Sequence, residues 1–171
     1  ATVFFSTNGR DWSENEGWLS SEHHCRWFQT KSYGEHCDGS GNILRLELNE
    51  NGLSGSLPSE LALLSNSLIG MNLGTSTTTD GFISGSLPSE IGLMANLQYI
   101  SLRNQQLAGA LPNEIGQLYY LNVLDLTRNK FEGPLVPSIG NLKRLYNLYL
   151  GSNYFSGVIP SGISEMRYLV N

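Results

Sequence analysis

Charge is scarce in this chain. Only 15% of its 171 residues are charged, against roughly 25% in typical globular chains. The ten Lys and Arg residues are scattered and the formal net charge is −5, so neither a nucleic acid nor an anionic membrane is expected as a partner. No apolar run approaches the roughly 18 residues that a membrane-spanning helix needs. These shortages favour a globular domain without membrane contact.

The common catalytic motifs are also missing. The chain has no Gly-rich phosphate loop, no Gly-x-Ser-x-Gly and no His-Glu-x-x-His. All three histidines fall within residues 1–42, so the rest of the chain offers no His as a general base. Glu47 and Glu50 form a carboxylate pair, but we expect both to lie open to water, where nothing raises a pKa as acid catalysis requires. We therefore expect a binding protein without a cofactor rather than an enzyme.

What the chain does contain is an internal repeat. Leu97, Leu121, Leu145 and Leu169 stand 24 residues apart, and each begins a near-copy of the same segment. Earlier copies begin at residues 43 and 68, and TSTTTDG at 75–81 stretches the second copy to about 30 residues. Residues 43–171 thus hold five repeats and the start of a sixth, and residues 1–42 form a separate cap. The stretch at 75–81 is either a functional loop or a tolerated insertion.

The repeat predicts one short strand per coil. Apolar residues alternate in Leu-x-x-Leu-x-Leu, as a strand with one buried face requires, and stacked coils place these strands in a parallel sheet. Asn51, Asn129 and Asn153 follow the strands by three residues, and we expect their amides to satisfy backbone groups there. Gln105 and Ser76 hold this position in the third and second copies, so we expect a weaker ladder there.

The consensus LxxLxLxxNxLxGxIPxxIGxL, over about residues 43–171, resembles the plant-type leucine-rich repeat of receptor-kinase ectodomains and polygalacturonase-inhibiting proteins. The resemblance implies an α/β solenoid, a right-handed superhelix with a parallel β-sheet on its concave face and 3-10, short helical or extended segments on its convex side. It also implies a secreted or cell-surface module, part of a receptor-like or adhesion protein, that binds a protein, peptide or glycan as a monomer. The alternatives are a secreted inhibitor of a foreign hydrolase and a structural, self-associating surface protein.

The cap resembles that of algal, diatom and other protist extracellular repeat proteins, through FFSTNGRDWSENEGWL and CRWF. In such caps a helix normally begins several residues earlier, and residues 169–171 begin another coil, so we expect more chain on both sides. Terminal repeats need a cover over their apolar end. The residues expected to form it are Phe4, Phe5, Trp12, Trp18, Leu19, Trp27 and Phe28.

The cap also holds the chain's two cysteines. Cys25 and Cys37 predict one disulfide, worth roughly 3 kcal/mol by loop closure, in an oxidising compartment. A zinc site with His23, His24 and His36 is the alternative. It lacks a Cys-x-x-Cys spacing, and adjacent His36 and Cys37 suit one tetrahedral ion poorly, so we favour the disulfide and predict no metal.

The repeat register predicts which side chains share the concave face. Side chains between the buried Leu positions should form columns, the first of them Arg45, Gly70, Tyr99, Val123 and Asn147, and the second Glu47, Asn72, Ser101, Asp125 and Tyr149. Tyr and Arg most often anchor interfaces. The candidate ligand-binding residues are therefore Tyr99, Arg103, Asp125, Arg128, Tyr146, Tyr149, Arg45 and Glu47. No exposed column repeats Thr, which argues against ice binding.

Overall fold

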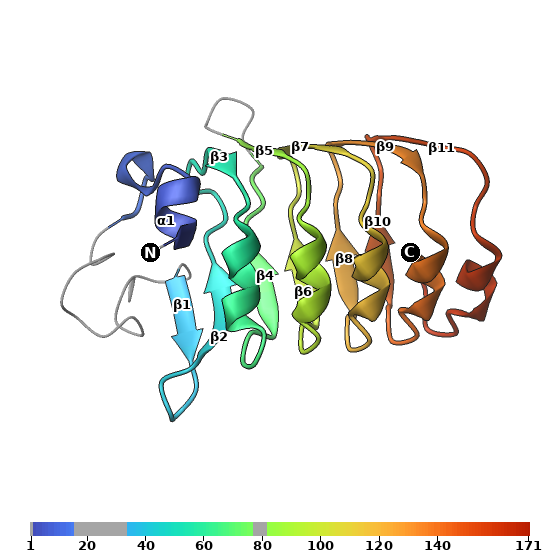
Figure 1. The fold of residues 1–171 in the computed structure, drawn as a ribbon, viewed down its shortest axis with the longest axis horizontal. Helices are drawn as coiled ribbons and strands as arrows, with labels where there is room; N and C mark the ends of the chain where they lie inside the picture. The colour runs from blue at the N-terminus through green and yellow to red at the C-terminus, as the bar shows by residue number, and fades with distance from the viewer. Residues whose placement is uncertain (1, 16–33, 77–81) are drawn as a thin grey trace.

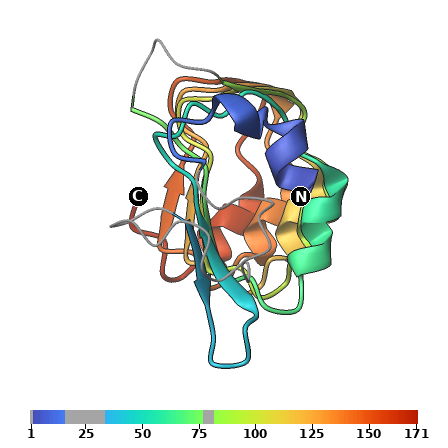
Figure 2. The same cartoon turned by 90° about the vertical axis from the view of Figure 1, so that its left-hand side faces the viewer.

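The coils of the repeat stack side by side into an elongated α/β solenoid (Figure 1). The computed structural model describes residues 2–15, 34–76 and 82–171. Each coil runs from a strand of the main sheet through a strand of a second sheet to a short 3-10 helix. Viewed along the stack, the main sheet and the helices lie on opposite sides (Figure 2). The predicted fold class is confirmed.

The main sheet runs through every coil in the order β1-β2-β4-β6-β8-β10. Its strands are β1 (Gly34–Cys37), β2 (Ile43–Glu47), β4 (Gly70–Asn72), β6 (Tyr99–Ser101), β8 (Val123–Asp125) and β10 (Asn147–Tyr149). From β2 onward the pairing is parallel, and the register aligns Arg45 with Gly70, Tyr99, Val123 and Asn147. This register confirms the columns expected from the repeat.

A second sheet and a row of 3-10 helices complete each coil. The strands are β3 (Gly55–Ser56), β5 (Ile83–Gly85), β7 (Gln106–Gly109), β9 (Lys130–Pro134) and β11 (Tyr154–Ser156). The helices are η3 (Ser59–Leu64), η4 (Ser89–Leu93), η5 (Asn113–Gln117), η6 (Pro137–Asn141) and η7 (Ser161–Glu165). Leu97, Leu121 and Leu145 are fully buried between these layers. Each such burial contributes roughly 1.5–3 kcal/mol of transfer free energy.

Side-chain amides link neighbouring coils inside the stack. Asn129 donates from Nδ2 to the carbonyls of Leu102 and Leu126 at 2.8 and 3.0 Å, and its Oδ1 accepts the Leu107 N–H at 3.1 Å. The expectation of a weaker ladder at Gln105 is wrong. Its longer side chain donates to the Leu73 carbonyl at 2.8 Å and accepts the Ile83 N–H at 2.7 Å, so the ladder continues there.

The cap contains α1 (Thr2–Ser6) and η1 (Gly9–Asp11), and its strand β1 pairs antiparallel with β2. Phe4 and Trp12 are buried with ring centroids 5.3 Å apart, but Phe5 is 62% exposed, so the expectation that Phe5 covers the first coil is wrong. Asn51 fastens cap to coil through two hydrogen bonds with the Glu14 backbone, at 2.6 and 3.0 Å. The other predicted cover residues lie outside the described residues: Trp18, Leu19, Trp27 and Phe28.

The predicted disulfide cannot be followed through both of its residues, because Cys25 lies outside the described residues, as do His23 and His24. No free cysteine occurs in the ranges that the structure describes. The pairing of Cys25 with Cys37 therefore stays a prediction. The described residues contain no helix that is both long and apolar enough to span a membrane.

Candidate ligand-binding face

Two glycines create hollows in the main-sheet face. Gly70 in β4 and Gly74 just beyond it are buried, and without side chains they leave the surface low between the flanking coils. The first hollow has a volume of about 400 Å³ and is called the Arg45 hollow; Arg45, Glu47 and Tyr99 are among the residues that line it. The second, about 380 Å³, is called the Arg103 hollow and is lined by Asn49, Glu50, Asn72, Gly74, Thr75, Ser76, Tyr99, Ser101, Arg103 and Asp125. Tyr99 and Asn72 line both, so the hollows adjoin.

The surroundings of the two glycines leave little room for a larger residue. A Cβ on Gly74 would lie 3.0 Å from the Ser101 Oγ and 3.2 Å from the Arg103 backbone N, closer than side chains ordinarily pack. A Cβ on Gly70 would lie 3.4 Å from the Arg45 Cγ, so the Arg45 stem overlies this position. A larger residue at 74 would thus press on the next coil, whereas one at 70 would contact the Arg45 stem.

Tyr99 is the central side chain of this face. It is 36% exposed, and partial burial raises the pKa of its phenol above the ordinary value. A hydrogen bond with Ser101 lowers this pKa, and the nearby carboxylates of Glu47 and Asp125 raise it. The phenol therefore remains protonated at neutral pH and can both donate and accept a hydrogen bond.

Polar side chains at the ends of the strands accept hydrogen bonds from the backbone two residues later. The Asp125 Oδ1 accepts the Thr127 N–H at 2.9 Å, and the Asn72 Oδ1 accepts the Gly74 N–H at 3.3 Å. Such bonds fix the side chains before a ligand arrives, which lowers the entropy cost of binding. Each hollow also offers both charge signs, with Arg45 beside Glu47 in one and Arg103 beside Asp125 in the other.

Glu50 has a structural task on this face. Its backbone is left-handed, with φ 55°, and its carboxylate accepts the Thr75 hydroxyl at 3.0 Å and the Ser76 N–H at 2.7 Å. The expectation that Glu47 and Glu50 form an open carboxylate pair is therefore wrong for Glu50, which ties the first coil to the start of the insertion. Residues 77–81 of that insertion lie outside the described residues.

Five of the eight predicted site residues line the hollows: Arg45, Glu47, Tyr99, Arg103 and Asp125. Tyr149 belongs to the second column, but neither Tyr149 nor Arg128 lines a hollow. Tyr146 precedes β10, and its ring packs on Tyr168 at 5.7 Å.

The sequence reading overlooked the glycines that make the hollows. Gly70 and Gly74 occupy the positions at which the third copy has Tyr99 and Arg103. The absence of large side chains at these two positions is the sequence feature that could have indicated the hollows. Within the described ranges, no group of three or more His, Cys, Asp or Glu residues could hold a metal ion.

Part of the repeat region matches a known protein family. The Leucine Rich Repeat family matches residues 96–118, 120–142 and 144–166. Together with the stacked parallel strands, these matches define the protein as a leucine-rich-repeat solenoid. No curated protein sequence matches the chain significantly.

Several solved structures of plant proteins share this fold. The BIR3–SERK2 complex of Arabidopsis thaliana superposes with a TM-score of 0.74 at 25% identity, covering 95% of this chain and 87% of that one. The plant peptide hormone receptor RGFR1, in complex with RGF2, superposes with a TM-score of 0.71 at 33% identity. The match covers 85% of this chain but only 20% of the matched chain. A plant ice-binding protein has a TM-score of 0.81 at 25% identity, covering 96% of this chain and 50% of its own.

Proposed function

We propose that the main-sheet face recognises a peptide or an extended protein segment, within an extracellular receptor-like or adhesion protein. The observation that carries the proposal is the pair of adjoining hollows that share Tyr99. Two shallow cavities beside one aromatic side chain suit a ligand that places successive side chains in neighbouring pockets. The complex of RGFR1 with RGF2 supports this role, because that peptide hormone receptor shares the fold.

The charges of the hollows favour a peptide over a uniformly charged polymer. Each hollow pairs an Arg with an acidic residue, so a ligand with both charge signs finds partners in each. A polyanion would meet Glu47 and Asp125 as well as the two arginines, and like charges at close range disfavour binding. A catalytic role has less support, because Glu50 is engaged in hydrogen bonds and the hollows contain no histidine.

A displayed library of random linear peptides, selected against the wild-type chain, tests the proposal. Selected peptides should bind Tyr99→Ala about tenfold more weakly or worse, as expected when a central aromatic anchor is lost. The double variant Tyr99→Ala with Tyr149→Ala should weaken them at least as much. The matched control is Tyr154→Ala, because Tyr154 is 68% exposed but belongs to the second sheet.

A further variant separates the hollows from the tyrosine itself. Gly74→Ala adds a methyl group at the wall of the Arg103 hollow, where it presses on Ser101 and on the Arg103 backbone, so it should also weaken the selected peptides. Each variant's melting temperature is measured alongside. Equal peptide affinity for wild type, Tyr99→Ala and Tyr154→Ala would contradict the proposal, as would a selection that enriches no peptide.

A further inference from the structure

A second surface lies on the rim formed by the loops that leave the 3-10 helices, at the bottom of the solenoid in Figure 1. Three successive loops carry four tyrosines that are between 46% and 57% exposed: Tyr119, Tyr120, Tyr146 and Tyr168. The corresponding loops of the first two coils carry small or polar residues instead, at 65–67 and 95–96. The fold therefore does not require aromatic residues here, and we call these four residues with Lys143, Arg144 and Arg167 the tyrosine rim.

Contacts between successive loops connect several of these residues. The Arg144 guanidinium lies over the Tyr120 ring, 4.7 Å from its centroid, and the Tyr146 and Tyr168 rings are 5.7 Å apart. A hollow of about 590 Å³ adjoins Tyr168 and is lined by Lys143, Ser164, Glu165, Arg167 and Tyr168. The Tyr120–Arg144 and Tyr146–Tyr168 contacts thus each join two successive loops of the rim.

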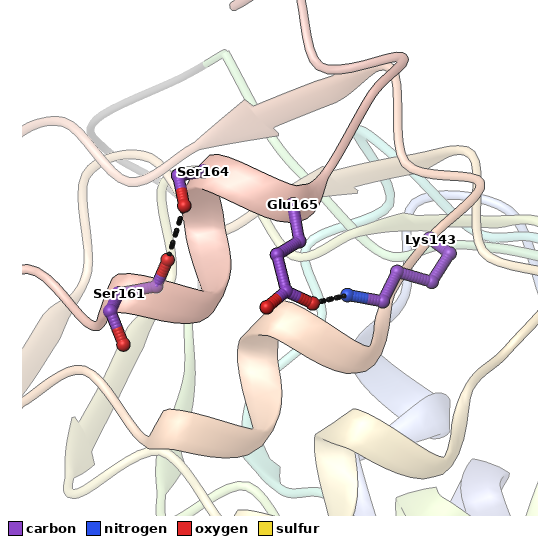
Figure 3. A network of polar contacts seen from close by, with 4 residues as sticks. All are labelled: Lys143, Ser161, Ser164 and Glu165. Atoms are coloured by element: carbon purple, nitrogen blue, oxygen red, sulfur yellow. Dashed lines mark hydrogen bonds and ion pairs between the residues drawn. The ribbon is translucent and has the colours of Figure 1, made fainter.

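The rim has a local excess of positive charge on a chain whose net charge is −5. It carries three of the ten basic residues, and the acidic side chain among them is Glu165, which pairs with the Lys143 Nζ at 2.8 Å (Figure 3). The guanidinium groups of Arg144 and Arg167 can bind a carboxylate or sulfate in bidentate fashion. The rim therefore complements an anionic ligand.

The neighbouring side chains indicate which anionic ligand fits. A protein interface usually has an apolar centre, but most side chains beside the rim are polar, such as Gln117 and Asn141. Its exposed aliphatic neighbours lie at its two ends: Val170 beyond Tyr168, and Leu63 in a hollow that Tyr120 also lines. Aromatic faces carry negative potential and attract the slightly positive C–H bonds of a sugar ring. Tyrosines with hydroxyl and basic groups around them suit a ligand made of rings, hydroxyls and acid groups.

We propose that the tyrosine rim binds an anionic polysaccharide, carboxylated or sulfated, separately from the main-sheet face. The aromatic rings stack on sugar rings, and Arg144, Arg167 and Lys143 bind the acid groups. Glu165 opposes this binding, because its carboxylate occupies Lys143. The proposal does not depend on the peptide-binding role of the main sheet.

Titration of the folded chain with defined polymers tests the proposal. The probes are polygalacturonate, a sulfated carrageenan, neutral dextran and polyglutamate. We expect at least one of the two anionic polysaccharides to bind and dextran not to bind. The double variant Arg144→Gln with Arg167→Gln should bind about tenfold more weakly or worse, because two charge-assisted contacts are lost. Its matched control, Arg10→Gln with Lys130→Gln, removes the same charge from the cap and the second sheet and should bind like wild type.

Two further variants distinguish stacking and local charge from general electrostatics. Tyr146→Ser with Tyr168→Ser should weaken binding while the control Tyr154→Ser does not. Glu165→Gln should tighten binding about two- to threefold, because it frees Lys143 from an exposed ion pair. All rim variants should bind the selected peptides normally.

Three results would overturn the proposal. Failure of both anionic polysaccharides to bind would mean that the rim does not recognise this class of ligand. Equal losses in the Arg144→Gln/Arg167→Gln variant and its matched control would show unspecific charge attraction. Binding of polyglutamate as tight as that of the polysaccharides, lost in the same rim variants, would assign the surface to an acidic protein segment instead.

Discussion

Replacing Asn129 with Ala tests what holds neighbouring coils together. The substitution removes the acceptor of the Leu107 N–H and the donor to the carbonyls of Leu102 and Leu126, and Asn129 is buried where water does not reach. A buried polar group without a partner costs about 1–3 kcal/mol. The Leu126 carbonyl keeps the Asn153 amide as a donor at 2.8 Å, so the groups that lose their bond are the Leu107 N–H and the Leu102 carbonyl. Two such groups, each at the lower end of that range, predict a loss of about 2 kcal/mol in the free energy of unfolding.

Asn153→Ala is the matched control, since the same side chain makes the same kind of bonds one coil later. Its amide donates to the Leu126 and Leu150 carbonyls at 2.8 and 3.0 Å and accepts the Phe131 N–H at 3.1 Å. Asn153 is only half-buried, so water can replace part of what is lost, and we expect a cost of about 1 kcal/mol.

Guanidinium denaturation gives the stabilities of both variants, and hydrogen exchange gives the local effect. The Leu107 amide should exchange faster in Asn129→Ala but not in Asn153→Ala, because it bonds Asn129 alone of the two. Equal stability losses in the two variants, or unchanged exchange of the Leu107 amide in Asn129→Ala, would refute the reasoning that burial makes the ladder strong.

Three further predictions concern the cap, the sheet faces and Tyr99. Mass spectrometry with and without reductant should show Cys25 and Cys37 joined, and the reduced chain should be about 3 kcal/mol less stable; an unchanged mass would contradict this. No thermal hysteresis is expected, despite the fold shared with a plant ice-binding protein, because exposed positions on the second sheet include Lys130, Glu132 and Tyr154 rather than one repeated small residue. Ultraviolet titration should give Tyr99 a pKa above the ordinary phenol value of about 10. The free energy of unfolding should therefore fall as pH rises from about 10 through the raised pKa, and Tyr99→Phe should abolish this part of the pH dependence.

The repeat period made most of the fold predictable. A fixed spacing of leucines determines which residues face the core, and the register of the strands follows because equivalent residues pair between coils. Gln105 shows where this reasoning failed. A residue that departs from the consensus predicts a weak point, but one extra methylene lets the Gln105 amide reach equivalent backbone groups.

The candidate site was predictable only in part. The repeat register placed Tyr99, Arg103 and Asp125 on the same face of the sheet, since this placement depends on spacing alone. The hollows depend on the missing side chains of Gly70 and Gly74, and a search for anchoring side chains overlooks such positions. The cap has no repeat to supply a register, so its exposed Phe5 and its antiparallel strand β1 could not be inferred from sequence.

The two proposed surfaces should respond differently to salt. Each hollow of the main-sheet face pairs an Arg with an acid, so its attraction for a peptide of mixed charge comes from close contacts more than from net charge. The tyrosine rim has an exposed excess of positive charge, and its ion pair Lys143–Glu165 is open to water. The Debye length, over which salt screens exposed charges, shortens from about 10 Å at 0.1 M salt to about 3 Å at 1 M.

Polysaccharide binding at the rim should therefore weaken steeply over that range of salt, whereas binding of the selected peptides should change little. The slope of the polysaccharide affinity against salt should become shallower in Arg144→Gln with Arg167→Gln and stay unchanged in the control Arg10→Gln with Lys130→Gln. A polysaccharide affinity that is insensitive to salt would mean that the arginines do not bind acid groups, and that ring stacking alone holds the ligand.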